Sequence, residues 1–108
     1  MINFTVSSRE YFKNLNKKDL NLLSLQYASH IELYDWNGEW FGNTNVLDMN
    51  KQMFESDLTF ELIESNQFEN RTYNEILIHT KSETIKVMDV LYFNKETRKI
   101  EKIKAYKG

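Results

Sequence analysis

Two aspartates stand at positions where the alternation of a β-strand places apolar side chains. Asp35 shares the alternation of Ile31 and Leu33, and Asp89 shares that of Val87. Burial strips the charged form of a carboxyl of its hydration, which raises its pKa. A carboxyl held in this way can carry a proton or donate a hydrogen bond near neutral pH. The pattern therefore indicates an acid–base site within the core.

A phenol joins the two carboxyls, and each of the three residues also has a simpler interpretation. Tyr11 lies on the apolar face of the first predicted helix and could donate a hydrogen bond to the same centre, or it could only pack on the sheet. Asp89 could meet backbone donors or pair with a cation on an adjacent strand, such as Arg71 or Lys104. Asp35 ends its predicted strand and could cap the turn that follows.

The composition argues against most other site chemistries. The sequence has no cysteine, which excludes disulfides and thiolate chemistry, and its three glycines are too few for a glycine-rich phosphate loop. His30 and His79 lack a third ligand at metal spacing, and there is no Gly-x-Ser-x-Gly elbow. A net charge of −2 argues against nucleic acid as a partner. We expect neither a metal nor a cofactor.

The elements that must position these residues follow from the apolar spacing. Ser7 and Glu10 form a capping-box pattern, and the next helix carries five apolar side chains, which predicts that it is largely buried. The pattern predicts helices over 7–16, 19–28 and 45–54, a strand over 29–35, an extended run from 58 to a turn near 67–70, and strands over 72–80, 84–93 and 99–106. Helices followed by an antiparallel meander are typical of the α+β class, here as one domain over residues 1–108.

Location and pocket closure are expectations from the ends of the sequence. The first residues show no basic segment followed by an apolar one, and no apolar run approaches the length of a membrane span. We therefore expect a cytoplasmic protein with no membrane partner. Because the sequence ends after its last predicted strand, we expect a partner subunit to close any pocket.

The sequence resembles the nuclear transport factor 2-like superfamily, in particular its ketosteroid-isomerase and SnoaL-like branches. The resemblance covers residues 11–108 and rests on YFKNLN (11–16), DL (19–20), LQYA (25–28), IELYD (31–35) followed by Gly42, VMDVLYF (87–93) and IKAYKG (103–108). It implies a cone-like barrel, in which a curved, mostly antiparallel sheet wraps around the N-terminal helices and encloses a pocket. It also implies a homodimer through the sheet face, where Met88, Val90 and Tyr92 are expected to be exposed.

The resemblance extends to the candidate catalytic residues. Aligned without gaps through the helices, the isomerase's oxyanion tyrosine falls on Tyr11, its base on Asp35 and its neutral aspartic acid on Asp89. The implied chemistry is a proton shuttle in which Asp35 takes a proton next to a carbonyl while Tyr11 and Asp89 stabilise the enolate. Trp36 stands where the isomerases usually carry proline, and the loop to Gly42 is about two residues shorter. We therefore expect a small apolar carbonyl compound rather than a steroid.

Three functions remain open. The first is an enzyme of the isomerase, cyclase or dehydratase type, and the second is a non-catalytic pocket that binds a hydrophobic ligand. The third is a dimeric interaction module whose pocket has no role. Under the first two, the residues expected to line the pocket are Leu15, Ile31, Leu33, Trp36, Trp40, Met53, Val87 and Leu91.

Overall fold

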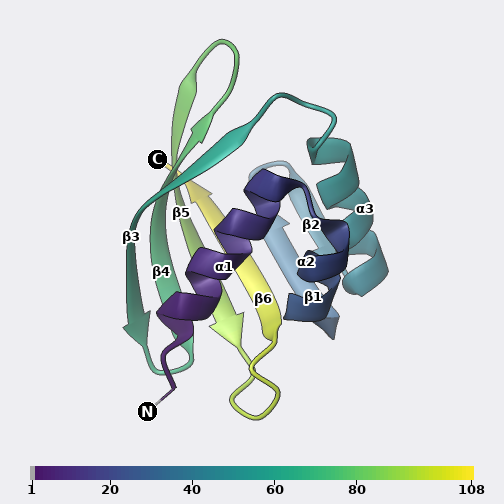
Figure 1. The fold of residues 1–108 in the computed structure, drawn as a ribbon, viewed down its shortest axis with the longest axis vertical. Coiled ribbons are helices and arrows are strands. Elements are labelled where there is room, and N and C mark those ends of the chain that lie inside the picture. Colours follow the sequence, from purple (N-terminus) through teal and green to yellow (C-terminus); the bar gives the residue numbers. More distant parts are fainter. Residues whose placement is uncertain (1) are drawn as a thin grey trace.

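A mixed sheet of six strands, with three helices against it, makes up the part of the chain that the computed structural model describes, residues 2–108 (Figure 1). No helix in this range combines the length and apolar character needed to cross a bilayer. The elements in chain order are α1 (Phe4–Lys17), α2 (Leu20–Gln26), β1 (Tyr27–Asp35), β2 (Gly38–Phe41), α3 (Asn43–Met53), β3 (Thr59–Phe68), β4 (Arg71–His79), β5 (Thr84–Phe93) and β6 (Ile100–Lys107).

The sheet has the curved, mostly antiparallel form that was predicted, and it is not closed. Its order is β2-β1-β6-β5-β4-β3, and only the β1–β6 pair, within residues 2–108, is parallel. α1 packs against β3 and β4, whereas α3 packs against β1 and β2 (Figure 1). The apolar core fills the space between these helices and the concave face of the sheet. This arrangement is α+β, as the sequence indicated.

The first helix begins three residues earlier than predicted. The side chain of Asn3 caps it by accepting a hydrogen bond from an amide of the first turn, so the helix starts at Phe4. The capping box predicted at Ser7 is therefore wrong. The next residue, Ser8, is buried inside the helix, and its hydroxyl lies 2.6 Å from that of Thr72 on β4.

The second helix has the predicted cap but not the predicted end or burial. Asp19 accepts a hydrogen bond from the amide of Leu22 at 3.0 Å, as an N-cap aspartate should. The helix stops two residues early because Tyr27 is already extended and begins β1. Leu23 is fully buried, but Leu25 is 69% exposed, so the prediction of a largely buried helix is wrong.

The strand β2 was not predicted. Its four residues follow the turn at Asn37 and pair antiparallel with β1, so that Gly38 lies opposite Asp35 and Trp40 opposite Leu33. Two of its four residues are glycine and glutamate, which leaves too little apolar alternation to reveal a strand. The hairpin matters for the site because it places Asp35 at the base of a tight turn.

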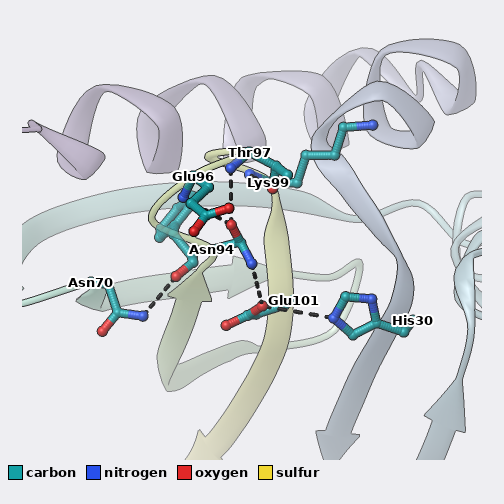
Figure 2. Close-up of polar contacts among 8 residues, drawn as sticks. His30, Asn70, Asn94, Glu96, Thr97, Lys99 and Glu101 are labelled. Carbon is teal, nitrogen blue, oxygen red and sulfur yellow. Dashed lines mark hydrogen bonds and ion pairs between the residues drawn. The ribbon is translucent and has the colours of Figure 1, made fainter.

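The turn between β5 and β6 is fixed by side chains (Figure 2). Asn94 accepts hydrogen bonds from the backbone amides of Glu96 and Thr97, both at 2.9 Å, and donates one to Glu101 at 3.4 Å. Glu101 also lies 3.7 Å from the imidazole of His30 on β1. These contacts connect the start of β6 to both of its neighbouring strands.

Side chains at the centre of the sheet's outer face are less exposed than predicted. Met88 is 37% exposed and Tyr92 is half-buried, but Val90 is only 4% exposed. The strand register places Tyr73 and Lys104 on either side of Val90, and their long side chains account for its burial. Val90 was expected to be exposed, and that expectation is wrong.

Candidate active site

A cavity of about 270 Å³ lies between α1, α3 and the concave face of the sheet. Its lining residues include Asp35 at the end of β1, Ile85 at the start of β5 and Leu58 between α3 and β3. Figure 1 shows that these ends of the elements lie at one end of the sheet. Its walls are mainly apolar, and no lysine, arginine or histidine lines it. The lining residues are Tyr11, Leu15, Leu33, Asp35, Trp36, Asn37, Met49, Asn50, Met53, Leu58, Phe60, Ile78, Thr80, Ile85, Val87, Asp89, Ile103 and Ala105.

The structure therefore places Tyr11, Asp35 and Asp89 on one cavity. Of the eight residues expected to line a pocket, five are on its wall: Leu15, Leu33, Trp36, Met53 and Val87. Ile31 and Leu91 lie instead in the closed core, where both are fully buried. Trp40 borders a separate hollow between β2 and α3.

Asp89 on β5 is a buried carboxyl that faces the cavity. It is 7% exposed, and its Oδ1 atom has no hydrogen-bond partner within the described part of the chain. Burial raises its pKa from the ordinary 3.8 to about 7, and the negative charge of Asp35 contributes to the rise. A carboxyl with this pKa is protonated in about half of the molecules at neutral pH.

Neither cation that was predicted to pair with Asp89 lies beside it. The guanidinium of Arg71 lies 5.0 Å from the ring centre of Tyr92, and the ammonium of Lys104 lies 5.9 Å from that of Tyr34. These contacts are on the outer face, as the strand register requires, whereas Asp89 faces the cavity. The interpretation of Asp89 as half of an ion pair is therefore wrong.

Asp35 has two environments at once. Its Oδ1 atom accepts hydrogen bonds from the amides of Asn37 and Gly38, at 2.6 and 3.1 Å, and so caps the β1–β2 turn. The same residue lines the cavity, and its charge raises the pKa of Asp89. The turn-capping interpretation and the cavity interpretation thus both describe this side chain, and the Oδ2 atom is in neither turn bond.

Tyr11 reaches the cavity from α1 and is 3% exposed. Burial, together with the neighbouring phenol of Tyr27 and the charge of Asp89, holds the pKa of Tyr11 well above its usual range. The phenol is consequently neutral at every physiological pH and can act as a hydrogen-bond donor.

Two further polar residues belong to the site and were not predicted. The hydroxyl of Tyr27 donates a 2.7 Å hydrogen bond to Oδ1 of Asn50, and both side chains are buried. The rings of Tyr11 and Tyr27 lie 6.3 Å apart, and Asn50 itself lines the cavity. Asn50 follows the buried Val46 by one helical turn, and this spacing is the sequence signal that could have identified it.

A separate polar network fixes the helix that carries Tyr11. Asn74 on β4 donates to the hydroxyl of Thr72 at 2.9 Å and to the backbone carbonyl of Asp89 at 3.0 Å. The Thr72 hydroxyl in turn contacts Ser8, one turn before Tyr11 on α1. The network connects the helix to the backbone of Asp89 through buried groups, so it limits how far the phenol and the carboxyl can move apart.

Within residues 2–108, no cluster of three or more histidine, aspartate or glutamate side chains has the arrangement needed to hold a metal ion. His79 contacts Glu61 at 2.8 Å, and its side chain is 40% exposed. What the cavity offers chemically is the carboxyl of Asp89, protonated in about half of the molecules at neutral pH, together with the carboxyl of Asp35 and a neutral phenol.

No protein-family model matches the sequence, and no curated protein matches it. Solved structures match the fold. An NTF2-like protein of unknown function from Cytophaga hutchinsonii is 12% identical, with a TM-score of 0.86 over 100% of this chain and 92% of the other. A SnoaL-like protein of unknown function from Burkholderia thailandensis is 21% identical, with a TM-score of 0.82 over 96% of this chain and 92% of the other.

A third structure, described as a proposed ketosteroid isomerase from Kribbella flavida, is 13% identical, with a TM-score of 0.84 over 94% of this chain and 74% of the other. At such identities the likeness concerns the fold, because one fold hosts many activities. The chain has the fold of the NTF2-like proteins, as the sequence resemblance indicated.

Proposed function

We propose that the protein binds a small apolar carbonyl compound in this cavity and moves a proton on it without a cofactor. The observation that carries the proposal is the buried carboxyl of Asp89, which lines the same cavity as Asp35 and Tyr11 and whose Oδ1 atom has no hydrogen-bond partner among residues 2–108. Burying a carboxyl in this way costs free energy once it is ionised, so a role in the site is the better explanation of its presence.

The proposed step uses each group once. Asp35 takes a proton from the carbon next to the carbonyl, and the electron pair of that C–H bond moves to form the enolate. Tyr11 and protonated Asp89 donate hydrogen bonds to the enolate oxygen, where negative charge develops. The protonated Asp35 then returns its proton to the same or another carbon, which restores the carbonyl.

A non-catalytic binding function for the same pocket is the second candidate. It is favoured by the two turn hydrogen bonds to Asp35, because a carboxyl that caps a turn has a structural role that needs no catalysis. In that case the mainly apolar wall would hold the ligand, and the proton on Asp89 would only provide a hydrogen bond.

Deuterium exchange separates the two candidates. In heavy water, the protein is mixed with an aryl ketone such as butyrophenone, and NMR follows the loss of the protons next to the carbonyl. We expect the unaltered protein to exchange these protons faster than buffer alone. Asp35→Asn should lower the exchange rate by about 10²- to 10⁴-fold and leave the affinity for the ketone unchanged. Tyr11→Phe should also slow the exchange, because it removes a donor to the enolate oxygen. Tyr73→Phe, on the outer face of β4 and on neither the cavity nor its rim, is the control. Binding without exchange in the unaltered protein would contradict catalysis and support the binding function.

A further inference from the structure

A second hollow lies on the outer side of the turn that borders the cavity. Its volume is about 670 Å³, and three of its lining residues, Asp35, Trp36 and Ala105, also line the cavity. The two spaces therefore share one wall. The remaining residues of this outer groove are Tyr34, Lys102, Lys104, Tyr106 and Lys107.

The ammonium groups of the outer groove lie over aromatic rings. The carboxylate opposite Lys102 on β1, that of Glu32, accepts a hydrogen bond from the hydroxyl of Tyr34 and forms no ion pair with these lysines. The ammonium of Lys107 lies 5.7 Å from the ring centre of Trp36, and that of Lys104 lies 5.9 Å from that of Tyr34. The ammonium of Lys102 similarly lies 5.4 Å from a ring centre. Within residues 2–108 none of the three takes part in an ion pair. A ring holds an ammonium in place but does not neutralise it, so the groove keeps an excess of positive charge.

The cavity has the opposite character. Its ionisable groups are the carboxyls of Asp35 and Asp89 and the phenol of Tyr11, with no cation among them. An anionic group placed inside would meet Asp35 in a poor solvent and would be excluded. In the groove, by contrast, three ammonium groups outnumber the carboxylate of Asp35, which lines it, together with that of Glu32, which borders it.

We propose that the ligand of the cavity is amphiphilic: an apolar carbonyl part fills the cavity, and an anionic group, such as a carboxylate, lies in the outer groove. The proposal rests on the function proposed above, since it names the class of compound on which the same site acts. Trp36 lines both spaces and would contact the link between the two parts. Asp35, on the same wall, would then face the carbons next to the carbonyl.

The test compares an acid with its neutral ester. 3-Benzoylpropionate and its methyl ester share an aryl ketone and differ in one charge. Calorimetric titration measures the affinity of each, and NMR measures deuterium exchange next to the ketone. The protein is used in the oligomeric state that light scattering finds. We expect the acid to bind about three- to tenfold more tightly than the ester, the range for two exposed charge pairs, with a smaller ratio at high salt.

The groove variant is Lys104→Gln with Lys107→Gln, and the matched control is Lys95→Gln with Lys99→Gln. The control pair is exposed in the β5–β6 turn, at the opposite end of β6 from Lys107, and removes the same charge (Figure 1). We expect the groove variant alone to lose the preference for the acid. The proposal that the groove binds the anionic group is wrong if the unaltered protein binds acid and ester equally well or binds neither of them. It is also wrong if both variants lose the preference for the acid to the same extent.

The two proposals can fail separately. If both probes bind with the same affinity and exchange at the same rate, the proposed proton shuttle is supported. The proposal that the ligand carries an anionic group is then wrong. A lysine-dependent preference for the acid without any exchange would support the groove as a binding determinant and contradict the shuttle.

Discussion

Asp35 and Asp89 line one cavity, and the negative charge of Asp35 adds to the effect of burial in raising the pKa of Asp89 to about 7. The two carboxyls come from strands that do not pair with each other, since β6 lies between β1 and β5. Their coupling is therefore a property of the fold rather than of a local motif. It means that the proton that Asp89 binds near neutral pH is held in the same cavity as the carboxyl of Asp35.

The first prediction concerns this coupling. Replacing Asp35 by asparagine removes the charge but keeps the shape, so the pKa of Asp89 should fall below 7. It should stay above 3.8, because burial is the larger cause of the rise. NMR titration of carbon-13 in the aspartate side chains measures the pKa of Asp89 in the unaltered protein and in the variant. A pKa for Asp89 near 4 in the unaltered protein would contradict the proposed proton shuttle.

The second prediction concerns stability and pH. Because the pKa of Asp89 is higher in the folded chain (about 7) than its ordinary 3.8, the folded state binds the extra proton between these values. The contribution to stability is complete below pH 3.8 and is lost as the pH rises to 7, by roughly 4 kcal/mol at most.

Asp89→Asn should remove this decline, so that the variant gains relative stability as the pH rises. Urea unfolding at several pH values between 4 and 8 measures the effect. Asp48→Asn, at an exposed position, is the control for the loss of a carboxyl. Parallel pH profiles for the unaltered protein and Asp89→Asn would show that Asp89 titrates normally.

The third prediction concerns the buried pair behind Tyr11. Tyr27→Phe leaves the Oδ1 atom of Asn50 buried without its donor, which should lower the free energy of unfolding by about 1–3 kcal/mol. Tyr106→Phe, at an exposed position, should change it little. Adding Asn50→Leu to Tyr27→Phe should recover part of the loss, since no polar atom is then left unpaired. Additive losses in the double variant would indicate that the bond has no part in stability.

The fourth prediction concerns the homodimer, which stays a prediction from the sequence. Met88 and Tyr106 pair across β5 and β6 and expose apolar surface on the outer face. If two copies meet there, Met88→Glu should yield monomers in light scattering. Leu25→Glu, on an exposed apolar residue of α2, should leave the mass unchanged. A mass equal to one chain in the unaltered protein would exclude the dimer.

The alternation of residues along a strand was enough to predict which side chains of the site point inward. Alternation around Ile31 and Leu33 directs Asp35 inward, and the same argument applies to Asp89; the structure places both on the cavity. Alternation could not show Val90 to be buried, because its cover comes from side chains on the neighbouring strands. Alternation within one strand carries no information about the strands beside it.

The parts that were not predicted depend on contacts between distant segments. Asn3 caps α1 three residues before the predicted start, and a single asparagine without an acidic residue in the following turn is a weak signal. Tyr27 and Asn50 meet only because α3 packs on β1. Ile31 and Leu91 were assigned to the pocket from alternation, which distinguishes inward from outward but not a cavity wall from closed core.

The position of β6 between β1 and β5 also governs when the site can assemble. The strands that carry Asp35 and Asp89 are both synthesised before residues 100–107, yet in the sheet formed within residues 2–108 it is β6 that joins them. While the chain emerges from the ribosome, β1 and β5 each expose an unpaired edge. Closure must then join segments about seventy residues apart, a long-range step of the kind that slows folding and exposes nascent chains to aggregation.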